Sequence, residues 1–149
     1  MIDTEELATL VPHKGKMFLL SRVISRDMEK HILVTEYDIN KDCLFYNEKL
    51  KGLPAWVGFE LMAQSISALS GFGAQAKGKD PLFGFILSVS ELVLHVPVLK
   101  GTVRIEVTED TVMNNVYSFR CAVFTGRETA VSAKLTVMET EDISMVGNR

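Results

Sequence analysis

The clearest candidate for chemistry in this sequence is Glu60, a carboxylic acid inside the largely apolar segment 54–76. Gln64 follows four residues later, so in a helix the two polar side chains would share one stripe. Burying an ionised carboxylate without a partner is costly, and such groups are rare unless they are paired, protonated or used in a reaction. Glu60 is therefore the best candidate for a general acid or base.

The segment 54–76 is predicted to form one long helix that positions this carboxyl group. Apolar residues surround its axis on nearly every side, which is typical of a helix inside a domain. Pro54 favours the first turn of a helix, and Gly78 with Pro81 provides a stop beyond the end. We expect the helix to be a buried core element.

Segments of extended chain surround this helix in the sequence. A short helix is predicted at 2–10, and strands are predicted at 18–24 and 31–39, at 82–98 with a bend near 88–91, and at 102–108, 117–123 and 131–137. The last three alternate apolar and polar residues, as an antiparallel sheet with one wet face does. The residues from Glu139 onward are polar and are expected to fray.

This order of elements predicts an α+β fold with an antiparallel sheet wrapped around one central helix, in a single domain over residues 1–149. A helix that is apolar on all sides needs cover where the sheet leaves it open. A second copy of the chain is the simplest cover, so we predict a homodimer.

Composition excludes several classes of function. The net charge of −3 argues against broad nucleic-acid binding, and no apolar run is long enough to span a membrane. Cys43 and Cys121 form neither a disulfide framework nor a zinc motif, which favours a reducing, cytoplasmic setting. No metal-ligand spacing, phosphate loop or dinucleotide fingerprint is present, so no metal and no cofactor are expected.

Two motifs resemble the hot-dog-fold 3-hydroxyacyl-[acyl-carrier-protein] dehydratases of fatty-acid synthesis. LVPHKGKMFLLSRVI at 10–24 is similar to the opening L-P-H-x-x-P-F/M-L-L-x-D-R-V of that family, and FELMAQ at 59–64 is similar to its helix motif E-A-M-A-Q. LPAWVGFELMAQ at 53–64 is closer still to dehydratase-like proteins of aryl-polyene pathways. The resemblance extends over nearly the whole chain and implies a hot-dog fold.

The resemblance also implies roles for individual residues. Glu60 matches the carboxylate that helps to eliminate water from a β-hydroxyacyl thioester, and Gln64 matches a glutamine that supports this site. Pro54 and Ala55 stand where the family has Pro-Gly, with a backbone N–H expected to point at the thioester carbonyl and to stabilise an enolate. The implied substrate is an acyl thioester of acyl carrier protein or coenzyme A.

One departure concerns the second acid or base. The family places its catalytic histidine in a G-H-F-P motif before the helix, whereas this chain has Phe45 and Tyr46 there, followed by Asn-Glu. His13 is the candidate for the missing group, although a structural role fits it as well because the family has this histidine in addition to its catalytic one. Tyr46 is a weaker candidate acid, and Phe45 and Trp56 are candidates to contact the acyl chain.

Three functions remain open at this point. The first is a 3-hydroxyacyl thioester dehydratase. The second is a hot-dog thioesterase, which can use a helix carboxylate and a helix N-terminus without a histidine. The third is a catalytically degenerate subunit that binds acyl chains or stabilises an active paralogue.

Overall fold

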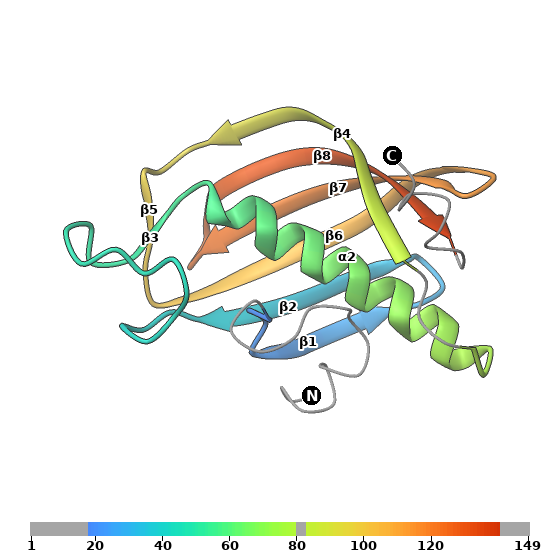
Figure 1. Ribbon diagram of the computed structural model, residues 1–149, viewed down its shortest axis with the longest axis horizontal. Helices are drawn as coiled ribbons and strands as arrows, with labels where there is room; N and C mark the ends of the chain where they lie inside the picture. Colours follow the sequence, from blue (N-terminus) through green and yellow to red (C-terminus); the bar gives the residue numbers. More distant parts are fainter. Residues whose placement is uncertain (1–17, 80–82, 141–149) are drawn as a thin grey trace, which may run out of the picture.

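A curved antiparallel sheet packs against one long helix in the computed structural model, which describes residues 18–79 and 83–140 (Figure 1). The helix is α2 (Val57–Ala76), and the strands are β1 (Arg22–Asp27), β2 (Ile32–Asp38), β3 (Leu53–Pro54), β4 (Phe83–Leu94), β5 (Val98–Leu99), β6 (Thr102–Met113), β7 (Val116–Thr125) and β8 (Glu128–Thr140). Six strands form the main sheet in the order β1-β2-β6-β7-β8-β4, and β3 pairs with β5. The predicted α+β architecture is confirmed.

The core lies between α2 and the concave face of the sheet. Val103, Ile105 and Val107 of β6 are fully buried, whereas Arg104 and Glu106 between them are partly exposed. This alternation is the period-two pattern expected of a strand with one face on the core. Within the described residues, no helix is long and apolar enough to cross a membrane.

A buried pair of hydroxyl groups fixes the position of α2 on the sheet. The Ser65 hydroxyl donates to the Leu61 carbonyl oxygen at 2.9 Å, and the Oγ atoms of Ser65 and Thr35 lie 2.8 Å apart. Because the single Ser65 proton goes to Leu61, the hydroxyl of Thr35 on β2 donates to Ser65. Both side chains are fully buried, so this pairing satisfies groups that would otherwise be costly to enclose.

The predicted start of the long helix is wrong by one turn. Pro54 lies in β3 opposite Val98, and the helix begins at Val57 with Trp56 as its N-cap residue. The Ala55 N–H donates to the Pro97 carbonyl oxygen at 3.0 Å. Pairing with a segment more than forty residues later therefore keeps 53–55 out of the helix.

Two glycines allow the backbone to approach the sheet closely around this helix start. A Cβ atom on Gly52 would lie 2.4 Å from the Leu99 carbonyl oxygen, and one on Gly58 would lie 3.0 Å from Cγ2 of Val131. The first distance is shorter than real Cβ contacts, and the second is tighter than most of them. The absence of a side chain at both positions thus seats the first turn of α2 against β5 and β8.

The first strand also begins later than predicted, at Arg22 rather than at residue 18. Leu19 and Leu20 are buried in the core but lie outside any strand. The Leu19 N–H donates to the side chain of Gln64 at 2.8 Å instead of to a neighbouring strand. A side chain on the helix thus replaces the ladder that the apolar pattern alone suggested.

One edge of the main sheet is formed by β4, and this strand is irregular as predicted. Its pairing with β8 shifts register between Ile86 and Ser88 and again between Ser90 and Val93, and Glu91 has a positive φ of 54°. Exposed aliphatic side chains lie along the strand at Ile86, Leu87, Val89, Leu92, Val93 and Leu94. Among the described residues, β4 has a neighbour on one side only.

Candidate active site

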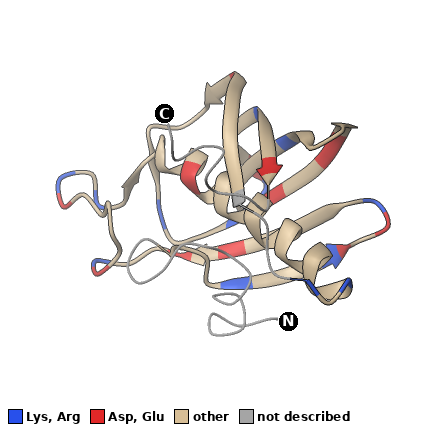
Figure 2. Cartoon of the chain, turned by 45° about the vertical axis from the view of Figure 1, so that its right-hand side comes forward, with Lys and Arg blue, Asp and Glu red and all other residues tan. Residues whose placement is uncertain are grey.

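Glu60 is the only charged residue of α2, and the rest of the helix is drawn without charge in Figure 2. Its carboxylate oxygen Oε1 accepts a hydrogen bond from Nε2 of Gln64 at 3.3 Å. The Gln64 side chain is fully buried, and its Oε1 accepts the Leu19 N–H at 2.8 Å. Because the Leu19 N–H fixes which end of the amide is the acceptor, the NH₂ group is turned toward Glu60. The predicted pairing of the two side chains on one stripe is confirmed.

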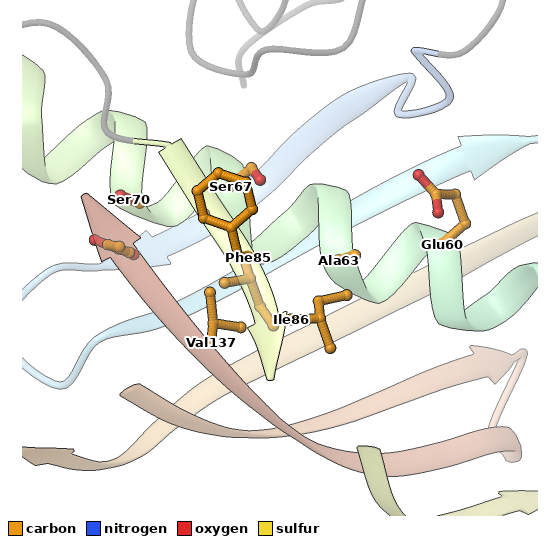
Figure 3. A pocket seen from close by; sticks show the side chains of 10 residues that line it. Glu60, Ala63, Ser67, Ser70, Phe85, Ile86 and Val137 are labelled. Carbon is orange, nitrogen blue, oxygen red and sulfur yellow. The ribbon is translucent and has the colours of Figure 1, made fainter. Parts of the chain in front are cut away.

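The Glu60 side chain is half-buried and opens into a cavity of about 250 Å³, which we call the front cavity. It is lined by Glu60, Ala63, Ile66, Ser67 and Ser70 of α2, Gly84, Phe85 and Ile86 of β4, and Val137 and Glu139 of β8. Figure 3 shows Glu60 at one end and Ser70 at the other, with Phe85 and Ile86 between them. An elongated, mostly apolar cavity with an acid at one end suits an acyl chain whose reacting carbons lie at that end.

The backbone at the start of the helix does not provide the hydrogen-bond donors that the sequence predicted. Proline has no N–H, and the Ala55 N–H is engaged by the Pro97 carbonyl oxygen, so neither residue offers a free backbone donor here. Within the described residues, no backbone carbonyl accepts from the N–H of Trp56 or Val57. The N–H groups left for a substrate oxygen are therefore those of Trp56 and Val57, two residues later than the sequence suggested.

Two of the predicted aromatic residues meet at this helix start. The rings of Phe45 and Trp56 lie edge to face with centroids 5.3 Å apart, and Trp56 is 51% exposed. Phe45 has a left-handed backbone with φ of 73°, whereas Tyr46 beside it is half-buried and donates its N–H to the Cys43 carbonyl oxygen. Neither ring lines the front cavity, so contact with an acyl chain stays a prediction for both.

The second acid–base group is not found among the described residues. His13, the predicted candidate, lies outside them. His31 is exposed and pairs with Glu109 at 3.6 Å, and His95 is exposed after the end of β4. Neither histidine lines the front cavity, and the described residues contain no cluster of three groups able to hold a metal ion.

A second carboxyl group at the far end of the front cavity was missed. Glu139 was expected to begin a frayed tail, but it lies in β8, is 9% exposed, and donates its N–H to the Asn115 carbonyl oxygen at 2.9 Å. Burial raises the pKa of its carboxyl group, a hydrogen bond from Ser70 opposes this, and the nearby charge of Glu109 raises the pKa further. The sequence around Glu139 does not predict its burial, because that burial depends on α2 and on the turn before β7.

Comparisons with known proteins agree with this architecture. The chain is 29% identical over 146 residues to the 3-hydroxyacyl-[acyl-carrier-protein] dehydratase FabZ of Ligilactobacillus salivarius, covering 93% of this chain and 99% of that protein. The dehydratase heterocomplex ApeI:P from Xenorhabdus doucetiae superposes with a TM-score of 0.84 at 20% identity, covering 95% of both chains.

The same fold occurs in a hypothetical thioesterase protein with coenzyme A from Streptococcus pneumoniae. It superposes with a TM-score of 0.62 at 11% identity, covering 80% of this chain and 84% of that one. At such identities the structural likeness establishes the hot-dog fold and leaves the activity to the sequence families. The family model for ApeP-like proteins, described as ApeP dehydratase, matches residues 5–147. Because that match spans nearly the whole sequence, this chain belongs to the ApeP-like dehydratase family.

Proposed function

We propose that this chain is a 3-hydroxyacyl-[acyl-carrier-protein] dehydratase, a hydro-lyase that acts in fatty-acid or polyene-type synthesis. The observation that carries the proposal is the carboxyl group of Glu60, oriented by Gln64 at one end of an apolar cavity in a member of a dehydratase family. The substrate class follows from the FabZ relative, whose name specifies acyl carrier protein.

The reaction consists of two proton transfers and two bond cleavages. The C–H bond next to the thioester carbonyl breaks, and its electron pair becomes the new carbon–carbon double bond. The C–O bond at the following carbon breaks, and the hydroxyl group leaves as water after it receives a proton. Glu60 supplies one of these transfers, since a positioned carboxyl group can donate or accept a proton in the transition state.

Negative charge develops on the thioester oxygen when the first proton is removed. The N–H groups of Trp56 and Val57 stand at the positive end of the α2 dipole and have no backbone acceptor among the described residues. We assign the stabilisation of this charge to these two donors in place of Pro54 and Ala55.

The described residues do not include the second proton-transfer group, so its identity is part of this proposal. His13 remains our candidate within the chain. A second subunit is the alternative source, because the front cavity is bordered by the edge strand β4. Replacing His13 with Gln distinguishes the two sources, since activity survives the change only if another chain supplies the group.

We further propose that a second hot-dog subunit pairs with β4, in the simplest case another copy of this chain. The exposed aliphatic residues of β4 support this, because such an edge is a template for strand pairing. The Xenorhabdus neighbour is a heterocomplex, which makes a related but different subunit the alternative. The molar mass of the purified chain in solution separates the cases, since a monomer that dimerises only with a related chain rules out the homodimer.

The activity is tested with a 3-hydroxyacyl thioester of acyl carrier protein and the assembled enzyme. We expect a conjugated enoyl thioester, seen by its ultraviolet absorbance and by the loss of one water in the mass of the acyl group. Absence of enoyl product, or an unchanged rate in Glu60→Gln, contradicts the proposal. Release of free thiol without loss of water identifies the thioesterase instead, and full activity of a complex that carries Glu60→Gln identifies a subunit that only binds or stabilises.

A further inference from the structure

A second cavity continues the front cavity along the same helix. This rear cavity has a volume of about 380 Å³ and is lined by Met28, His31, Leu69, Ser70, Gly73, Ala74, Ala76, Lys77, Lys79, Glu109, Tyr117, Phe119 and Glu139. Both cavities include Ser70 and Glu139 in their walls. These two residues therefore stand at the boundary between them.

The positions of the lining residues along α2 explain why the two cavities follow the same line. The α2 residues in the front cavity are 60, 63, 66, 67 and 70, and those in the rear cavity are 69, 70, 73, 74 and 76. Spacings of three and four residues keep all of these positions on one side of a helix. One stripe of α2 thus forms the floor of a single trough that runs from Glu60 to the end of the helix.

Two polar side chains, Ser70 of α2 and Glu139 of β8, stand in the trough where the two cavities meet. The Ser70 side chain is half-buried, the Glu139 side chain is buried, and the Ser70 hydroxyl is near enough to Glu139 to lower the pKa of its carboxyl group against the effect of burial. Burial favours the neutral form of this carboxyl group, so the boundary is polar but uncharged over a wider pH range than an exposed glutamate would give. On the front side the lining is mainly apolar, with Ala63, Ile66, Phe85, Ile86 and Val137.

We propose that the Ser70–Glu139 pair sets the maximum length of the acyl chain that this enzyme accepts. An acyl chain that extends from Glu60 along the α2 stripe reaches this pair after ten residues of helix, which is about 15 Å. An extended chain advances about 1.2 Å per bond, so roughly a dozen bonds fill the front cavity. A longer chain must pass between these two side chains and place alkyl carbons against a buried carboxyl group, so it binds less well.

This inference rests on the proposed function, since it places the thioester at Glu60. The test measures kcat/KM of the assembled enzyme for a series of straight-chain 3-hydroxyacyl thioesters of increasing length. In the unmodified protein we expect kcat/KM to fall by about 5- to 100-fold once the chain is longer than the front cavity. In Glu139→Ala and in Ser70→Ala we expect this fall to move to longer chains, because the rear cavity becomes accessible, with short chains unaffected.

Two variants serve as matched controls. Glu139→Gln keeps the size and the polarity of the side chain, and Glu109→Gln changes a carboxyl group that lines only the rear cavity. Both should retain the original length limit. Thermal unfolding of each variant confirms that the fold is intact, and an identical length limit in all variants, or an equal loss at every length, overturns the inference.

A second readout separates this inference from the proposed function. Free fatty acids of the same lengths compete with a fluorescent fatty acid for the cavity, and this competition requires no dehydration. A length limit that moves in Glu139→Ala supports the boundary even if no thioester is dehydrated. A limit that stays in place overturns the boundary even if the enzyme is active.

Discussion

The two ends of the front cavity both carry a glutamate, but their surroundings differ. Glu60 lies on the helix, is half-buried, and is held by the amide of a glutamine whose orientation is fixed by the Leu19 N–H. Glu139 lies on β8, is buried, and has a pKa that is raised mainly by burial and lowered in part by the nearby Ser70 hydroxyl. The first arrangement suits a group that meets a substrate and exchanges protons, and the second suits a fixed wall. The same type of side chain is thus placed in two environments that favour different roles.

The largest effect expected from this comparison is on catalysis. Glu60→Gln removes the exchangeable proton but keeps the shape of the side chain, so we expect kcat/KM for a short 3-hydroxyacyl thioester to fall by about 10²- to 10⁴-fold. The same substitution at Glu139 should leave that rate within a few-fold of the original. Similar rates for the two variants would remove the functional difference between the two ends.

An intermediate effect is expected at Gln64, which links the acid to the core. Gln64→Leu leaves the Leu19 N–H without its acceptor and Glu60 without this donor. We expect the free energy of unfolding, measured by denaturant titration, to fall by about 1–3 kcal/mol, accompanied by a loss of activity. Ser67→Ala, a substitution on the same face of α2, is the control and should change the free energy of unfolding much less. An unchanged free energy in Gln64→Leu would show that this buried amide is not needed to hold the segment before β1.

The sequence predicted the pairing of Glu60 with Gln64 well because the relevant information is local. The spacing of Glu60 and Gln64 places them on one stripe in any helix, and the alternation at 103–107 places three residues in the core of any sheet. The position of Pro54 could not be predicted in this way. A proline suits both a first helical turn and a short edge strand, and here the pairing with Val98 decides between them.

Distant contacts explain the other differences. Leu19 fits a strand by composition, yet its N–H is taken by Gln64, 45 residues away in sequence. Glu139 follows a strand of alternating residues and resembles the start of a polar tail, but α2 covers it and Asn115 accepts its N–H. In each case a hydrogen bond or burial imposed by another element overrides the local pattern.

The smallest effect expected is the pH dependence of stability caused by Glu139. Because its pKa is raised in the folded state, the unfolded state ionises first as the pH rises, and stability is lost between the unfolded and the folded pKa values. Glu139→Gln removes this loss. The variant should therefore be more stable than the original protein at neutral pH, and the difference should disappear in acid below the unfolded pKa, as measured by thermal unfolding across pH. A difference that persists in acid would mean that the carboxyl group is not the titrating cause.

The two interruptions in β4 also bear on which strands can attach to it. A regular, flat edge with exposed aliphatic side chains would accept almost any extended segment and promote aggregation. In β4 the register shifts after Ile86 and again after Ser90, and Glu91 within the second shift has a left-handed backbone conformation. A strand that pairs with β4 must have matching irregularities to continue the hydrogen-bond ladder. The irregularity therefore favours one complementary strand and disfavours pairing with unrelated extended segments.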